Sequence, residues 1–236
     1  MIKTWKKIKN LFNKEIPDIA FWCEKEGLKD LNPIKKSITQ IPQWFKDIAF
    51  KDKTIKNCPG LIDYFNIGYI HYLWTDIDVN IPDNENEPTQ YNVPDPNNFK
   101  VQFHHRSQYL DFLPTDKYRF ILKPISPWRC KTKKGIKLLQ LPLYYEFSEI
   151  FDVMPGIINT SYYHQLHPQI CFKKTGRFLL PRGLPLCMLV PIKEDKLTMK
   201  ILDKSDITTQ WENDARMKIQ TKFPGEYKKI KTRLDK

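Results

Sequence analysis

The 236-residue sequence contains few histidines whose spacing could bind a metal ion. His104 and His105 are adjacent, and neighbouring residues of a strand point to opposite faces, so both imidazoles cannot easily bind one ion. His164 and His167 have a spacing suited to ligation only in a helix, and Pro168 disfavours a helix there. We therefore expect no metal site and no metal cofactor.

Carboxylates and nucleophiles give no clear sign of an enzyme either. Asp76 and Asp78 share one face of a predicted strand, a few residues after His71. Two such carboxylates could bind a cation or act as acid and base, but they are more typical of a solvated face opposite Ile77 and Val79. The nucleophile motif G-x-S-x-G and the phosphate-binding motif GxxxxGK are absent. These patterns predict no catalytic residue and no cofactor.

Aromatic side chains give a stronger signal. The chain contains 6 Trp, 11 Tyr and 14 Phe. Trp5, Trp22, Trp44 and Phe45 fall in the N-terminal part, where regular structure is weakest. Aromatic residues in irregular segments often anchor a chain on a partner. Two interpretations stay open: these four side chains bind a partner, or they hold the N-terminal segment on its own β-domain.

The net charge of +12 bounds the classes of partner. An acidic segment, 61–100, separates two basic regions, and the pI near 9.3 permits binding to nucleic acid. Most of the excess is lysine, which also serves as a solubilising coat, and no nucleic-acid-binding signature is present. We therefore do not favour nucleic acid as the partner.

The five cysteines form no CxxC pair and are expected to be free thiols.

No part of the sequence indicates export or membrane insertion. The N-terminal segment begins basic, but lysines and asparagines interrupt its apolar positions, so it lacks the core of a signal peptide. No apolar run approaches the roughly 18 residues of a membrane span. Ile8, Leu11 and Phe12 fall on one face of a short predicted helix, which suits docking on the same protein or a neighbour. We expect a protein that is neither secreted nor in a membrane.

The hydrophobic pattern predicts a mainly β fold. Strand-like segments recur every 8 to 14 positions, a spacing typical of a sandwich or barrel. They comprise residues 19–23, 69–79, 99–104, 119–123, 126–132, 136–141, 176–180 and 185–191. Two pairs, 126–132 with 136–141 and 176–180 with 185–191, are separated by glycine turns and predict hairpins. The proline-rich segment 80–98 predicts a loop.

These elements divide the chain into three predicted parts. Residues 1–55 form an irregular N-terminal arm that packs on the core or on a partner. Residues 56–193 form the β-rich core domain, with a short helix that ends near Gly68. Residues 194–236 form a C-terminal helix, which begins at a capping box around Thr209, and a basic tail.

One segment resembles a known enzyme family. The segment Pro155–Tyr162, PGIINTSY, is similar to the substrate-loop motif G-x-I-D-x-x-Y of trimeric dUTPases and dCTP deaminases. The strand–turn–strand segment 178–190 resembles the strand pair that follows in that family. Across residues 126–192 the resemblance implies the dUTPase-like β-clip fold and assembly as a homotrimer.

The same resemblance implies an alternative function, a nucleotide-binding or nucleotide-hydrolysing protein. In that function Asn159, Tyr162 and Arg129 would surround the nucleotide, with Tyr162 packing under the deoxyribose. Asn159 stands where the family has its catalytic carboxylate, and an amide cannot act as a general base at neutral pH. The segment Ser126–Arg129 only loosely matches the family's phosphate-binding motif P-R-S-G, and the fold does not carry the activity by itself.

The whole chain resembles an uncharacterised family of proteins from tailed bacteriophages and some bacteria. The shared features are Ile41-Pro42-x-Trp44-Phe45, Cys58-Pro59, Gly68-Tyr69-Ile70, Ser126-Pro127-Trp128 and Gly156-Ile157-Ile158. The resemblance implies viral origin and adds no catalytic residue. We therefore expect a non-enzymatic structural or assembly component of a virion, present in the virion or the host cytoplasm. Its expected partners are other phage structural proteins and further copies of itself.

Overall fold

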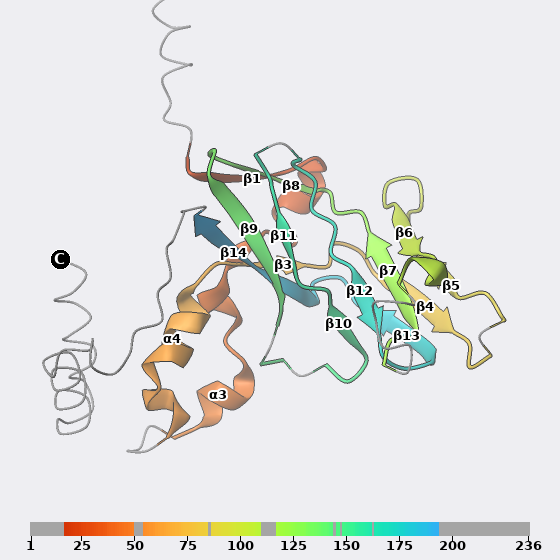
Figure 1. The fold of residues 1–236 in the computed structure, drawn as a ribbon, viewed down its shortest axis with the longest axis horizontal. Helices are drawn as coiled ribbons and strands as arrows, with labels where there is room; N and C mark the ends of the chain where they lie inside the picture. The colour runs from red at the N-terminus through yellow and green to blue at the C-terminus, as the bar shows by residue number, and fades with distance from the viewer. Residues whose placement is uncertain are drawn as a thin grey trace, which may run out of the picture. The chain divides into compact units, whose positions relative to one another are not determined.

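The computed structural model describes residues 17–49, 54–84, 86–109, 117–143, 145–146, 148–161 and 163–193. This part of the chain forms three short α-helices and fourteen strands (Figure 1), which confirms the predicted mainly β class. Trp5, Tyr162 and the predicted C-terminal helix lie outside the described residues.

The described residues belong to two compact units. The first unit contains residues 17–36 and 68–193, and the second contains residues 37–67. Residues 17–36 of the expected N-terminal arm belong to the β-rich unit.

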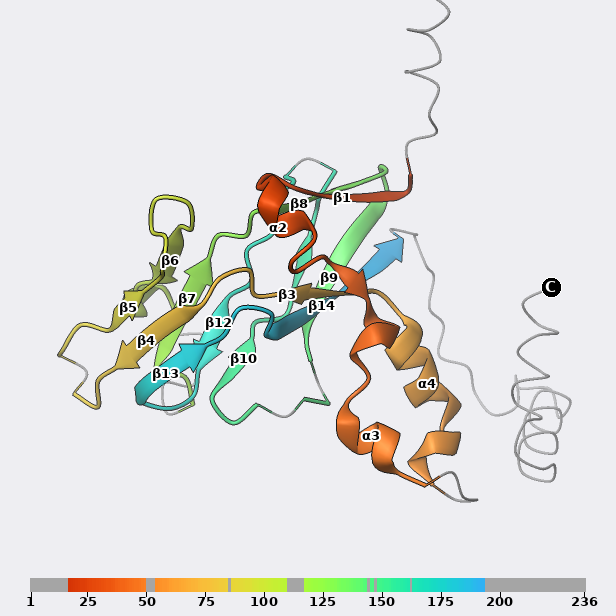
Figure 2. The same ribbon diagram turned by 180° about the vertical axis from the view of Figure 1, so that it is seen from behind.

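The described strands of the first unit form four antiparallel sheets (Figures 1 and 2). One sheet pairs β1 (Ile19–Cys23) with β8 (Trp128–Thr132). A second has the order β10 (Phe151–Val153), β12 (Ile170–Phe172), β7 (Phe120–Pro124) and β6 (Val101–His104). A third has the order β11 (Gly156–Ile158), β9 (Ile136–Pro142), β14 (Pro185–Lys193), β3 (Tyr69–Tyr72) and β2 (Lys35–Lys36). The fourth has the order β13 (Gly176–Leu180), β4 (Ile77–Ile81) and β5 (Gln90–Asn92).

One hydrophobic core joins these sheets and gives the unit its β-sandwich character. Ile77 and Val79 of β4 are fully buried while Asp78 points outward, as the alternating pattern predicts. β14 is instead buried over the continuous run from Leu186 to Val190, which is typical of a central strand. The shared core includes Val79, Leu122, Cys130, Leu138, Phe172 and Leu189.

Both predicted hairpins are wrong in their pairing, although their turns are correct. Gly135 and Gly183 have φ of 84° and 86°, the left-handed conformation that a turn glycine supplies. The strands on either side of each turn join different sheets, because β8 pairs with β1 and β13 pairs with β4. An alternating pattern specifies which face of a strand is buried, but it does not specify the hydrogen-bonded neighbour.

The second unit is a small helical segment. It contains the 3-10 turns η1 (Ser37–Gln40) and η2 (Ile55–Asn57), with the helices α3 (Gln43–Asp47) and α4 (Pro59–Asn66). Pro59 occupies the first turn of α4, where a missing N–H costs nothing. Ser37 Oγ donates to the carbonyl oxygens of Phe65 and Ile67 at 3.0 and 2.6 Å, which satisfies the end of that helix.

Two of the predicted anchors, Trp44 and Phe45, lie on α3. The Phe45 ring packs on Phe65 of α4, with 5.0 Å between ring centroids. Trp44 contacts Phe45 edge-on and is 36 % exposed. Phe45 therefore contributes to the interior of the second unit, while Trp44 lies at its surface.

The remaining short elements lie in the first unit. The helix α2 (Glu26–Lys29) follows β1, and the 3-10 turn η3 (Arg106–Gln108) follows β6. Residues 82–89 and 93–98 of the proline-rich segment contain no helix or strand among the described positions. Between them β5 adds one short strand that the prolines did not predict.

Candidate functional site

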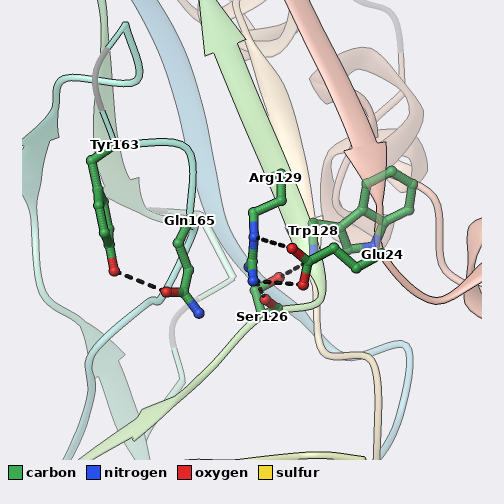
Figure 3. Close-up of polar contacts among 6 residues, drawn as sticks. All are labelled: Glu24, Ser126, Trp128, Arg129, Tyr163 and Gln165. Carbon is green, nitrogen blue, oxygen red and sulfur yellow. Dashed lines mark hydrogen bonds and ion pairs between the residues drawn. The ribbon is translucent and has the colours of Figure 1, made fainter.

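Arg129, the predicted phosphate contact, is held by groups of its own chain (Figure 3). Its Nε and Nη2 atoms donate to the two carboxylate oxygens of Glu24 at 2.9 and 2.6 Å. Its Nη1 donates to the carbonyl oxygen of Ser126 at 2.7 Å. A bidentate arginine–carboxylate pair is among the stronger polar contacts in proteins. A nucleotide phosphate would therefore have to displace Glu24 before it could bind this guanidinium.

Ser126 is a buried junction between three segments. Its Oγ accepts a hydrogen bond from the backbone N–H of Trp128 at 3.0 Å and lies 2.9 Å from His71 Nε2. Its own N–H donates to the carbonyl oxygen of Leu166 at 3.1 Å. Every polar group of Ser126 is thus used, and the residue is only 1 % exposed. The serine stabilises the fold and is closed to a substrate.

His71 completes this junction from β3. The imidazole is fully buried and stacks on Trp74, with 5.5 Å between ring centroids. Burial lowers the pKa of His71 to about 3, so the ring is neutral at physiological pH. A serine–histidine pair of this kind resembles part of a hydrolase site in composition only, because neither side chain reaches the solvent.

Asn159, the predicted counterpart of the catalytic carboxylate, lies in the turn after β11. Its Oδ1 accepts hydrogen bonds from the N–H and the hydroxyl of Ser161 at 3.3 and 2.6 Å, and the residue is exposed. Asn159 therefore stabilises a local turn. Within the described residues, no hydrogen bond joins Asn159 to Arg129, and Tyr162 lies outside them.

The segment that follows Asn159 runs along the free edge of β8. The Thr160 hydroxyl donates to the buried hydroxyl of Thr132 at 3.0 Å. The Cys130 N–H donates to the carbonyl oxygen of His164 at 2.8 Å, and Gln165 forms a bridge with Arg129. β8 therefore has β1 on one side and residues 164–166 on the other.

The outward side of this arrangement carries exposed aromatic side chains. Trp22 of β1 is the direct partner of Arg129, so both project from the same face. Trp22 is 40 % exposed and packs edge-on against His164 with 5.6 Å between centroids. Tyr163 is 52 % exposed, and its hydroxyl donates to Gln165 Oε1 at 2.9 Å (Figure 3). We call Trp22, Glu24, Arg129, Tyr163, His164 and Gln165 the Trp22 surface.

The Trp22 surface contains residue types that are common in protein interfaces. Tryptophan, tyrosine and arginine are the residues most enriched where alanine substitution disrupts protein interfaces. The sequence predicted Trp22 as a candidate anchor, either on a partner or on its own domain, and contained no indication that Tyr163 and Arg129 would lie on the same surface. Their juxtaposition depends on the pairing of β8 with two segments far from it in the sequence.

Further exposed apolar side chains lie on outermost strands. Phe103 on β6, Ile157 on β11 and Leu179 on β13 are 51, 63 and 66 % exposed. Within the described sheets, each of these strands is hydrogen-bonded to a neighbour on one side only. Unpaired strand edges with apolar side chains favour association with another chain.

The histidines and aspartates considered above as metal ligands or acid–base groups have other surroundings in the structure. His104 and His105 line a hollow of about 200 Å³. The Asp76 carboxylate accepts a hydrogen bond from the Arg182 N–H at 2.6 Å, and Asp78 pairs with Arg177. No group of three histidine, cysteine or acidic residues in the described ranges could hold a metal ion. No described helix is long and apolar enough to cross a membrane.

Comparisons with known proteins give no further identification. No model of a known protein family matches the sequence, and no curated protein is detectably similar to it. The resemblances to a bacteriophage family and to dUTPases therefore stay predictions.

Proposed function

We propose that this chain is a non-enzymatic bacteriophage protein, a structural or assembly component of the virion that acts through protein–protein contacts. In this proposal the β-sandwich is of the β-clip type and assembles as a homotrimer. Its partners are other structural proteins of the same phage.

One contrast supports the proposal. The side chains that resemble catalytic groups are buried or already paired: His71 and Ser126 are inaccessible, and Arg129 is held by Glu24. Several large apolar or aromatic side chains remain exposed, and some of them lie on strand edges, as Ile157 and Leu179 do. Such a surface suits binding to a protein better than it suits turnover of a small molecule.

Mass spectrometry of purified virions tests the proposed role directly. Particles of the phage that encodes this chain should contain it at a fixed ratio to the major structural proteins, after removal of loosely bound material by density-gradient centrifugation. A host-cytoplasmic phage enzyme of similar abundance is the matched control for carry-over. Absence of the chain from both mature particles and assembly intermediates would overturn the proposal.

Two measurements on the purified chain test the rest. Light scattering during size-exclusion chromatography should give three times the 28.2 kDa of one chain. Incubation with a panel of deoxynucleotides and Mg²⁺ should give neither turnover nor a shift in melting temperature. Turnover of any nucleotide would favour the alternative function at Asn159, Tyr162 and Arg129.

A further inference from the structure

A hollow of about 580 Å³ lies in the first unit, away from the Trp22 surface. The end of β9, the strand β10 and the start of β14 provide its apolar floor. Phe151, Val153 and Leu186 of this floor are buried, at 8, 2 and 2 % exposed. The volume is in the range of sites that hold a small ligand or a few side chains of a peptide. We call it the acidic hollow because of its rim.

The rim carries three carboxylates, Glu146, Glu149 and Asp152, and one ammonium group, Lys173. Lys173 Nζ donates to Asp152 Oδ1 at 3.2 Å and also to the Ser148 carbonyl oxygen, which fixes one wall of the hollow.

The other two rim carboxylates remain accessible. Glu149 is exposed and is bound by Lys174 at 2.9 Å, an ion pair that water screens. Glu146 is exposed and has no ion pair among the described residues. An apolar floor with a net negative rim suits a cationic and partly apolar occupant.

The chain itself contains a segment of this chemistry. Residues 1–16 include five lysines and one glutamate, together with the apolar side chains of Ile2, Trp5, Ile8, Leu11, Phe12 and Ile16. The segment is therefore complementary to the hollow in both charge and hydrophobicity. The basic tail at 227–236 has lysines but no tryptophan or phenylalanine, so it matches the apolar floor less well.

The position of β1 favours an occupant from another copy. Residue 18 lies beside Lys133, just before β9 begins, whereas the acidic hollow lies where β9 ends. Figures 1 and 2 both show β1 at the far end of β9 from β10. To fill the hollow of its own chain, the N-terminal segment would have to return along the seven residues of β9, a path of about 23 Å that would use about half of its extended length. A second copy can present all of residues 1–16.

We propose that the acidic hollow binds the N-terminal segment, residues 1–16, of a second copy of this chain. The aromatic ring of Trp5 contacts the apolar floor, and the lysines lie against Glu146 and Glu149. This inference rests on the proposed function, because it supplies one of the contacts through which the chain assembles.

Photo-crosslinking of the full-length chain tests the inference. One preparation carries p-benzoylphenylalanine at position 5, and it is mixed with a ¹⁵N-labelled preparation that has the natural residue there. After irradiation, mass spectrometry should find crosslinks between the unlabelled position 5 and labelled peptides covering residues 142–153 or 184–186. Two results would overturn the inference when equal amounts of the two preparations are mixed. In the first, position 5 is crosslinked only to unlabelled peptides; in the second, it is crosslinked to other segments of the chain.

Charge reversal at the rim provides the second measurement. Glu146→Lys should lower the crosslink yield about fivefold, because an approaching lysine segment meets a like charge. Glu87→Lys makes the same change of charge at an exposed carboxylate beside the smaller hollow and should leave the yield unchanged. Equal yields from both variants would contradict binding at the acidic hollow.

The molecular mass of the same samples separates the two proposals. An oligomer without a crosslink at the acidic hollow would remove the inference and leave the proposed assembly intact. A monomer at all concentrations would remove both, since the occupant is a second copy.

Discussion

The two sides of strand β8 differ in what their polar and aromatic groups do. On the inner side, Ser126 just before the strand and His71 behind it are buried and hydrogen-bonded to each other. On the outer side, Trp22 and Tyr163 are about half exposed beside the Arg129–Glu24 pair. Groups that resemble a catalytic pair therefore serve stability, and the groups available to a partner are aromatic.

This difference explains why residue type alone is a poor guide to function in this chain. A buried polar group needs its hydrogen bonds, because leaving one unmade costs about 1–3 kcal/mol. An exposed aromatic ring has no such need and gains free energy only when a partner covers it. Substitutions on the inner side should change stability, and substitutions on the outer side should change association.

The largest effect is expected at the inner junction. Ser126→Ala removes one hydroxyl that has two roles. This hydroxyl accepts the hydrogen bond of the Trp128 backbone N–H, and it is the hydrogen-bond partner of His71 Nε2. We expect the free energy of unfolding to fall by about 3 kcal/mol, since two buried groups lose a hydrogen bond. Urea unfolding monitored by tryptophan fluorescence measures this change in the free energy of unfolding.

Ser161→Ala is the matched control for this substitution. It removes an exposed hydroxyl that only donates to Asn159, so the free energy of unfolding should change by less than about 0.5 kcal/mol. Similar values for the two variants would show that the junction does not stabilise the fold.

The second effect is a loss of stability in mild acid. In the folded chain burial lowers the pKa of His71 from 6.5 to about 3, whereas in the unfolded chain it is near 6.5. Below pH 6.5 the unfolded state binds a proton that the folded state does not, so stability falls as the pH falls toward 3. We expect a loss of about 2 kcal/mol between pH 7.5 and 5, measured by urea unfolding at several pH values.

His71 is not the sole source of this pH dependence. Burial also lowers the pKa of His167 to about 4, so His167 adds to the loss over the same pH range, and His167→Gln separates the two contributions. Carboxyl groups such as Asp78, whose pKa is lowered by the hydrogen bond and charge of Arg177, lose their contribution only as the pH falls through lower values. His105→Gln changes an exposed histidine and should keep the acid loss. Constant stability between pH 6.5 and 5 would contradict a buried neutral His71.

Local features of the fold could be predicted from the sequence because they depend on neighbouring residues. The alternation of Ile77, Asp78 and Val79 identified the buried face of β4. The predicted strand segment 69–79 is nevertheless divided into β3 and β4, which join different sheets and leave Asp76 outside both strands. The turns at Gly135 and Gly183 were identified because only glycine adopts positive φ there at little cost. Periodicity and turn chemistry are local signals, so one sequence carries them without an alignment.

The site could not be predicted because its contacts join distant parts of the chain. Ser126 and His71 are 55 residues apart, and Arg129 and Glu24 are 105 residues apart. Each pair depends on which strands become neighbours, and the alternating pattern leaves that choice open. The same limit produced the wrong hairpin pairings, and it allowed Arg129 to be considered as a free phosphate contact.

A smaller effect tests the alternative function at Arg129. Glu24→Gln removes the carboxylate charge while keeping the shape, and it should lower the free energy of unfolding by about 1 kcal/mol, because Glu24 is half exposed. The proposal expects no binding of deoxynucleotides to this variant by isothermal titration calorimetry. If Arg129 belongs to a nucleotide site, release from Glu24 should instead strengthen binding of the nucleotide phosphate.

The smallest effect on stability, and the most informative for function, is expected at Trp22. Trp22→Ser should lower the free energy of unfolding by less than about 1 kcal/mol, because Trp22 is 40 % exposed and its ring packs edge-on against His164 at the surface. It should at the same time reduce the molecular mass measured by light scattering at low micromolar concentration, or abolish incorporation into particles.

Leu31→Ser is the matched control, since it removes an apolar side chain that is 56 % exposed and lies outside the strands. A loss above about 2 kcal/mol with unchanged assembly would show that Trp22 holds β1 on its own domain, the second of the two interpretations that the sequence left open.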